Sequence, residues 1–159
     1  VNADYFGLVP PERLQVEGGI IYFTADGRER GKLGLSPERS KGIAGSYNPA
    51  AGHLTLLFYD PPAEHSGYVN SKWALQEEPY EGDAINAYND GPVGDDGKQM
   101  GDFYELESSS PALALAPDES SAHIQSILHL YGDQSALQEI LDETVKIDWR
   151  RFHGLSIEP

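Results

Sequence analysis

The sequence predicts a mainly β protein, an antiparallel β-sandwich with one C-terminal helix. Seventeen glycines and eleven prolines are scattered along 159 residues without a period, which is typical of short strands joined by turns rather than of a helical bundle. Several short runs alternate apolar and polar residues or are rich in β-branched and aromatic residues. Helical spacing of apolar residues occurs once, close to the end of the chain.

The first sixty residues predict two hairpins and one further strand. The expected strands cover residues 14–16, 20–24, 32–35, 42–47 and 53–59. Gly18 and Gly19 can adopt the positive φ angles of a tight turn between the first two strands. Residues 48–52, Asn-Pro-Ala-Ala-Gly, are turn formers and connect the last two.

The second half predicts three more strands and the helix. The strands are expected over 84–88, 102–109 and 121–131, and the helix over 135–147. Because a turn at 116–120 joins the last two strands, we expect them to pair or to lie side by side. Ser135 and Gln138 match a capping box at the start of the helix. The rest of 60–101 predicts a long loop, and such loops are often functional.

Length and composition fit one domain and exclude several classes of partner. We expect residues 1–147 to form a single β-sandwich domain or its C-terminal half, and residues 148–159 to form a tail. The N-terminus has neither an initiator Met nor a signal-type stretch, so the chain is expected to be trimmed, processed or partial. A formal net charge of -15 argues against nucleic acid. The absence of a long apolar run argues against membrane insertion. Without cysteine there is no disulfide, thiolate metal site or cysteine nucleophile.

Two carboxylates share one face of the strand predicted at 102–109. The β-carbons of Glu105 and Glu107 would lie about 6.6–6.8 Å apart, close enough for each charge to raise the pKa of the other where water is scarce. Such a pair can donate a proton to a sugar oxygen and accept one from a hydroxyl group. We therefore take Glu107 and Glu105 as candidate catalytic residues, the alternative being an acidic face in solvent.

Two histidines share one face of the strand predicted at 121–131. His123 is a candidate catalytic residue, and His129 a candidate ligand-binding residue, since neutral imidazole can accept a proton from a sugar hydroxyl. The alternative is a pair of hydrogen-bonded structural side chains. At about 20 Å apart on one strand, the two cannot hold the same metal ion.

A third set of candidates lies in the long loop. Asn86, Asn89 and Asp90 offer amide and carboxylate groups to sugar hydroxyls, unless they only form a turn. With Asp95 and Asp96 they could coordinate calcium, although the spacing is not that of an EF-hand, and no other cofactor or metal is predicted.

Aromatic and basic residues complete the candidate set. Trp73 and Tyr88 could stack on a pyranose ring, the alternative being core packing. The one basic cluster predicts a solvated hairpin surface, or else a site for an anionic sugar such as a uronate; its members are Arg28, Arg30, Lys32, Arg39 and Lys41.

Four segments, 68–71, 78–83, 86–92 and 103–111, resemble a family of bacterial extracytoplasmic proteins without an assigned function. The most specific are Asn-Asp-Gly-Pro at 89–92 and Glu-Leu-Glu-Ser-Ser-Ser-Pro at 105–111, and the likeness extends from about residue 5 to 147. Those proteins are similar to galactose mutarotases and other sugar-active members of the β-supersandwich superfamily, in which one concave sheet face receives a saccharide.

The resemblance implies that this chain matches the C-terminal half of a supersandwich. Leu106-Glu107 followed by Pro117-Asp118-Glu119 is similar to the mutarotase order of a catalytic Glu strand and a Pro-Gly-Glu turn, with Asp118 in place of Gly. It also implies a periplasmic or secreted location. Because half of the fold would then be missing, we expect a companion chain, either an N-terminal half or a second copy.

Three functions remain open from the sequence. The first is a carbohydrate-binding protein whose acids and imidazoles project into one hollow. The second is a sugar-active enzyme, either a mutarotase- or epimerase-like isomerase or a glycan lyase or hydrolase, in which Glu107 and a histidine exchange protons. The third is a structural half of a larger assembly. The saccharide is the expected ligand in the first two.

Overall fold

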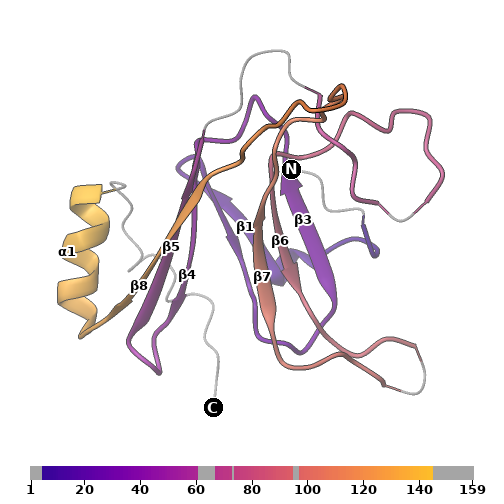
Figure 1. Cartoon of the computed structure of the whole chain (residues 1–159). Helices are drawn as coiled ribbons and strands as arrows, with labels where there is room; N and C mark the ends of the chain where they lie inside the picture. The colour runs from indigo at the N-terminus through magenta and orange to yellow at the C-terminus, as the bar shows by residue number, and fades with distance from the viewer. Residues whose placement is uncertain (1–4, 61–66, 73, 95–96, 145–159) are drawn as a thin grey trace.

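The computed structural model describes residues 5–60, 67–72, 74–94 and 97–144 and shows a mainly β fold (Figure 1). The elements in chain order are η1 (Pro11–Arg13), β1 (Leu14–Glu17), β2 (Ile20–Phe23), β3 (Gly31–Leu35), β4 (Ile43–Asn48), β5 (His53–Tyr59), β6 (Ile85–Asn89), β7 (Tyr104–Ser108), β8 (Gln125–Tyr131) and α1 (Gln134–Thr144). The strands form three antiparallel sheets, β1-β2, β3-β6-β7 and β4-β5-β8. The predicted fold class, a β-sandwich with one C-terminal helix, is confirmed.

Both predicted hairpins form where turn residues permit them. Gly18 and Gly19 adopt φ angles of 61° and 81° between β1 and β2, a conformation that residues with a β-carbon adopt at a cost. In the β4-β5 hairpin, Gly52 has a φ of 55° and directly precedes β5. Its backbone also contacts the chain just after β8, because the amide of Gly132 donates to the carbonyl of Gly52 over 3.0 Å. The hairpin end is thereby fastened to the neighbouring strand.

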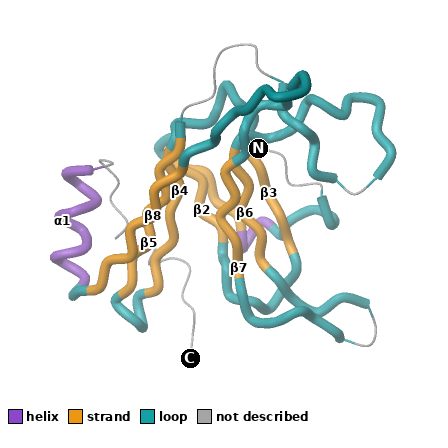
Figure 2. The backbone as a smooth tube through the Cα atoms, in the orientation of Figure 1, coloured by secondary structure: helices purple, strands orange, loops and turns teal. Residues whose placement is uncertain are grey.

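Strand β5 lies at the centre of the layered structure. Its residues alternate between two faces, so Leu57 and Tyr59 pack with Ile85 of the sheet β3-β6-β7. On the opposite face, Leu54 and Leu56 form a second apolar cluster whose other buried members, Leu137 and Leu141, come from α1. Figures 1 and 2 show the resulting order of helix, sheet β4-β5-β8 and sheet β3-β6-β7.

The strands β7 and β8 do not pair with each other, contrary to the prediction. β7 pairs with β6, and β8 pairs with β5 in the other sheet. The predicted turn does exist, since the amide of Glu119 donates to the carbonyl of Ala116 and Asp118 has a φ of 68°. A turn reverses the chain but does not decide which neighbour each strand finds, and here residues 109–124 lead from one sheet to the other.

The helix α1 begins two residues earlier than the capping box indicates. The carboxylate of Asp133 is the cap: its Oδ1 accepts hydrogen bonds from the amide of Ala136 over 2.9 Å and from the hydroxyl of Ser135 over 2.7 Å. Ser135 therefore lies inside the helix rather than at its N-cap. The predicted end of the helix at 145–147 and the tail 148–159 lie outside the described residues.

The edge of β8 carries exposed apolar side chains. Ile127 is 49% exposed and Leu128 is 45% exposed, and within the described residues β8 pairs with β5 alone. A companion chain that covers this edge stays a prediction. None of the helices in the described ranges is long and apolar enough to cross a membrane.

Candidate functional site

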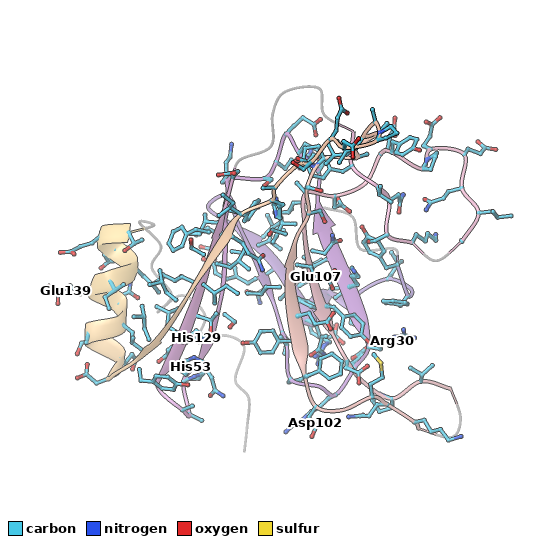
Figure 3. The ribbon with its side chains drawn as sticks, viewed as in Figure 1. Arg30, His53, Asp102, Glu107, His129 and Glu139 are labelled. Carbon is cyan, nitrogen blue, oxygen red and sulfur yellow. The ribbon has the colours of Figure 1, made fainter. Side chains whose placement is uncertain are left out.

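The sheet β3-β6-β7 presents a polar surface on the side away from β4-β5-β8. Two rows of residues cross its strands in register: Lys32, Tyr88 and Glu105 form the first, and Gly34, Asn86 and Glu107 the second. Ile85 of β6 and Leu106 of β7 point to the other sheet. Because side chains alternate along a strand, the next residues, Asn86 and Glu107, point away from it. We call the side chains of Lys32, Asn86, Tyr88, Glu105 and Glu107 the polar face; Figure 3 labels Glu107.

An ion pair fixes one of the two carboxylates of the polar face. Nζ of Lys32 donates a hydrogen bond to Oε2 of Glu107 over 2.7 Å. The side chain of Lys32 is 12% exposed and that of Glu107 is 33% exposed, so water screens this pair only in part. The ammonium also lies 5.5 Å from the ring centre of Tyr5. Glu107 is thus held as a carboxylate acceptor at a known position.

The second carboxylate holds its proton more tightly than an ordinary glutamate. A hydrogen bond to Glu107 raises the pKa of Glu105, and partial burial and the negative charge of Glu107 act in the same direction. Lys32 opposes these effects through its positive charge. The prediction that the two acids share one face is confirmed by the β6-β7 register. The pair can present one proton donor and one acceptor side by side.

An unpaired acceptor lies next to Glu107. Asn86 is 3% exposed, and its Oδ1 is buried without a hydrogen-bond partner among the described residues. An unsatisfied buried acceptor costs about 1–3 kcal/mol and is rare in folded proteins. Asn86 stands directly opposite Glu107 in the β6-β7 register, so its free oxygen belongs to the same group of polar atoms.

A glycine makes room for a further acid above this row. A β-carbon on Gly34 would lie 2.3 Å from Oδ2 of Asp83, which is closer than side-chain contacts allow. The carboxylate of Asp83 accepts a hydrogen bond of 2.5 Å from the hydroxyl of Tyr5, and Asp83 is 5% exposed. The sequence interpretation singled out neither Tyr5 nor Asp83, because their contact joins residues 78 positions apart.

Asn89 and Asp90, which the sequence predicts as ligand-binding residues, form hydrogen bonds within the protein. Asn89 is fully buried, and its side chain accepts from the amide of Gly27 over 2.9 Å and donates to the carbonyl of Glu29 over 2.8 Å. Asp90 is 1% exposed and accepts from the hydroxyl of Tyr88 over 2.6 Å and the amide of Gly101 over 2.9 Å. Both side chains hold loops against the sheet, and Asn89 shares the strand face of Ile85, opposite to that of Asn86.

The aromatic candidates are also not open for stacking in the described structure. Tyr88 is 5% exposed, and its ring lies between Phe6 and Phe103, with centroids 5.8 Å and 6.0 Å away. Burial raises the pKa of the Tyr88 hydroxyl, and its hydrogen bond to Asp90 raises it further. Trp73 lies outside the described residues.

The calcium hypothesis is not tested by the structure. Asp95 and Asp96 lie outside the described residues. Within the described ranges there is no group of three or more His, Asp or Glu side chains that could hold a metal ion.

The histidines lie on the other side of the sheet from the acids. Nε2 of His123 is 2.9 Å from the hydroxyl of Ser108, a residue whose side chain points to the opposite face from Glu107. His129 belongs to β8 in the other sheet and contacts His53 (Figure 3). The expectation of one hollow shared by acids and imidazoles is therefore wrong, and the structure does not bring Glu107 together with a histidine.

Part of the predicted basic cluster belongs to this site. Lys32 pairs with Glu107, and the guanidinium carbon of Arg30 lies 3.9 Å from the ring centre of Phe6. Nε of Arg30 also donates to the hydroxyl of Tyr88 over 3.3 Å. These two residues are half-buried rather than solvated. The sequence contained one signal for this placement: residues 30 and 32 are two positions apart, and such residues share one face of a strand.

A shallow hollow lies beside the exit of β7, apart from the polar face. It has a volume of about 420 Å³, and its lining contains no charged side chain; the lining residues are Val69, Ser109, Ser110, Pro111, Ala112 and Leu113. The polar face itself is thus a strand surface and not the wall of this hollow.

Comparison with known proteins assigns the chain to a family but not to an activity. No curated protein and no solved structure matches it. The model of a family of unknown function, DUF6786, matches residues 1–153. Since this match covers nearly all of the sequence, the chain belongs to the DUF6786 family.

Proposed function

We propose that the polar face binds a saccharide. The observation that carries the proposal is the buried Oδ1 of Asn86, an acceptor without a partner in the described structure, directly opposite the carboxylate of Glu107. A sugar hydroxyl that donates to this oxygen would remove the cost of the unpaired acceptor.

The other groups of the polar face suit the same ligand. Sugar hydroxyls both donate and accept hydrogen bonds, and the face offers the carboxyl groups of Glu105 and Glu107 and the ammonium of Lys32. Phe6 is 39% exposed and offers an apolar ring near Tyr88 and Arg30. The resemblance to galactose-mutarotase-like proteins supports this reading, as well as a periplasmic or secreted location.

The shape of the site favours an extended ligand. Of the side chains of the polar face, Glu105 is exposed and Glu107 is 33% exposed, whereas Asn86 and Tyr88 are 3% and 5% exposed, so the part that a ligand can reach runs along β7. We therefore propose an oligosaccharide that lies along the strands, rather than a single sugar ring enclosed on all sides.

Binding is tested by titration calorimetry with a panel of neutral and uronic-acid mono- and oligosaccharides, chosen by thermal shift. At least one oligosaccharide is expected to bind saturably. Asn86→Ala and Glu107→Gln are each expected to weaken that binding by about fivefold, which corresponds to one hydrogen bond of about 1 kcal/mol. Glu139→Gln, an exposed acid on α1, is the matched control and is expected to bind as the wild type does.

Two outcomes would contradict the proposal. The first is a panel in which no saccharide binds the wild-type chain. The second is a saccharide that binds Asn86→Ala and Glu107→Gln with the wild-type affinity, because its site would then lie elsewhere. Circular dichroism of each variant shows whether a lost affinity comes from a lost fold.

A second candidate function is proton transfer on the bound sugar, favoured by the raised pKa of Glu105 beside Glu107. In this case the two carboxyl groups, rather than Glu107 and a histidine, would act as acid and base. Anomer exchange followed by NMR and glycan cleavage followed by chromatography are the two assays. Glu105→Gln and Glu107→Gln are each expected to reduce the rate by about 10²-fold or more, while Glu139→Gln retains it. Binding without either reaction supports recognition alone.

A further inference from the structure

Two imidazoles from different strands meet beside the end of the β4-β5 hairpin. Nε2 of His53, on β5, lies 3.3 Å from Nδ1 of His129, on β8 (Figure 3). The hydroxyl of Thr55 lies 3.0 Å from Nδ1 of His129 and 3.4 Å from Nε2 of His53. These three atoms form a nearly equilateral triangle. His53 and Thr55 lie on the face of β5 that also carries Leu57 and Tyr59, and so on the side of the sheet β3-β6-β7.

The backbone and a stacked ring fix this arrangement. The β5-β8 register places Thr55 opposite His129 and His53 opposite Tyr131. The ring of Tyr131 lies parallel to that of His53, with centroids 4.4 Å apart and an angle of 5° between the planes. The hydrogen bond between Gly132 and Gly52 holds the two strand ends together next to these rings. His53 and His129 are therefore positioned by their strands and not by chance contact of long side chains.

The spacing of the two nitrogens matches that of two ligands on one metal ion. With metal–nitrogen bonds of about 2.0–2.1 Å and tetrahedral angles, two ligand atoms lie about 3.3–3.4 Å apart. The observed distance is 3.3 Å, and the triangle that Thr55 completes has sides of 3.0, 3.3 and 3.4 Å. We propose that His53 and His129 bind a divalent transition-metal ion, Zn²⁺, Ni²⁺ or Cu²⁺, through these two nitrogens.

The chemistry of the surroundings agrees with an open, two-imidazole site. Imidazole suits these three ions, whereas calcium and magnesium prefer oxygen ligands. Because the described residues hold no group of three or more His, Asp or Glu suited to a metal, solvent would fill the coordination positions that the histidines leave. The net charge of -15 raises the concentration of cations near the surface.

The proposal is tested on the full chain after treatment with a chelator and its removal, by calorimetric titration with Zn²⁺, Ni²⁺ and Cu²⁺. One ion per chain is expected to bind. His53→Gln and His129→Gln are each expected to weaken this binding at least about tenfold, since the loss of groups that merely support a ligand already costs 10–100-fold. His123→Gln is the matched control, an exposed histidine outside the pair, and is expected to keep the wild-type affinity.

The double variant His53→Gln/His129→Gln measures binding by the three other histidines of the chain. Zn²⁺ is expected to raise the melting temperature of the wild type but not of this variant. Nitrogen NMR distinguishes metal binding from a purely structural role of the histidines. If Zn²⁺ binds to them, it should change the chemical shifts of Nε2 of His53 and Nδ1 of His129. Equal affinity in the wild type and the double variant, or no shift at these two nitrogens, would overturn the proposal.

Discussion

Replacing Leu57 with alanine is expected to lower the free energy of unfolding by about 2–5 kcal/mol. Leu57 is 1% exposed and packs at the contact between the two three-stranded sheets, where Tyr59 and Ile85 are its buried neighbours. The alanine would lose the transfer free energy of three carbon atoms and leave a cavity that strands on both sides cannot close without shifting the sheets.

The loss is measured by urea denaturation at neutral pH, followed by circular dichroism. Leu75→Ala is the matched control, because Leu75 is fully exposed and its truncation is expected to change the free energy by less than about 0.5 kcal/mol. If Leu57→Ala were as stable as this control, the contact between the sheets would not be the principal core of the protein.

Replacing Asp26 with alanine is expected to cost about 2–3 kcal/mol at neutral pH, since hydrogen bonds to a charged group are worth that much when they are lost. The carboxylate accepts from the guanidinium of Arg13 over 2.5 and 3.2 Å, and the side chains of both residues are 14% exposed. It also accepts from the amide of Arg28 over 3.0 Å and from Asn89 over 3.4 Å. The variant would leave the Arg13 guanidinium without this partner.

This contribution depends on pH in a defined direction. Burial acts to raise the pKa of Asp26, but the hydrogen bonds from Arg13 and Arg28 and the charge of Arg13 outweigh it and lower the pKa below 3.8. Stability from a carboxyl group with a lowered pKa is present above its unfolded pKa and is lost as the pH falls through the folded one. The difference in stability between wild type and Asp26→Ala should therefore stay constant near neutral pH and shrink as the pH falls below 3.8 towards the lowered pKa of Asp26.

Denaturant titrations at several pH values test both statements, with the exposed neighbour Glu12→Ala as the control. A difference that stays constant as the pH falls below 3.8 would show that the carboxylate of Asp26 is not the source of the lost stability. A double-mutant cycle with Arg13→Ala isolates the part that belongs to the pair.

Local patterns in the sequence predicted most of the strands, because turns and alternation act over a few residues. The hairpin at Gly18 and Gly19 needs only the conformational freedom of glycine, and the alternation at Glu105 and Glu107 needs only the two-residue period of a strand. These features do not depend on the rest of the fold. For the same reason, they say nothing about which strands become neighbours.

The errors arose where distant segments meet. The pairing of β7 with β6 and of β8 with β5 places Glu107 and His129 in different sheets, although their strands are consecutive in the chain. The capping box at Ser135 is not used, because the carboxylate of Asp133, two residues earlier, accepts from the amide of Ala136 and the helix already begins at Gln134. The partners of Glu107 and His129, Lys32 and His53, are each more than 70 residues away, and one sequence contains no signal for such contacts.

The central position of β5 has a consequence for how the protein unfolds. Alternate residues of this one strand supply Leu57 to the contact between the sheets and Leu54 and Leu56 to the contact with α1. If either α1 or the sheet β3-β6-β7 separated from β5, apolar side chains of β5 would become exposed to water. The helix and the two sheets should thus melt as one cooperative unit, and the amide protons of β5 should be among the slowest to exchange with solvent.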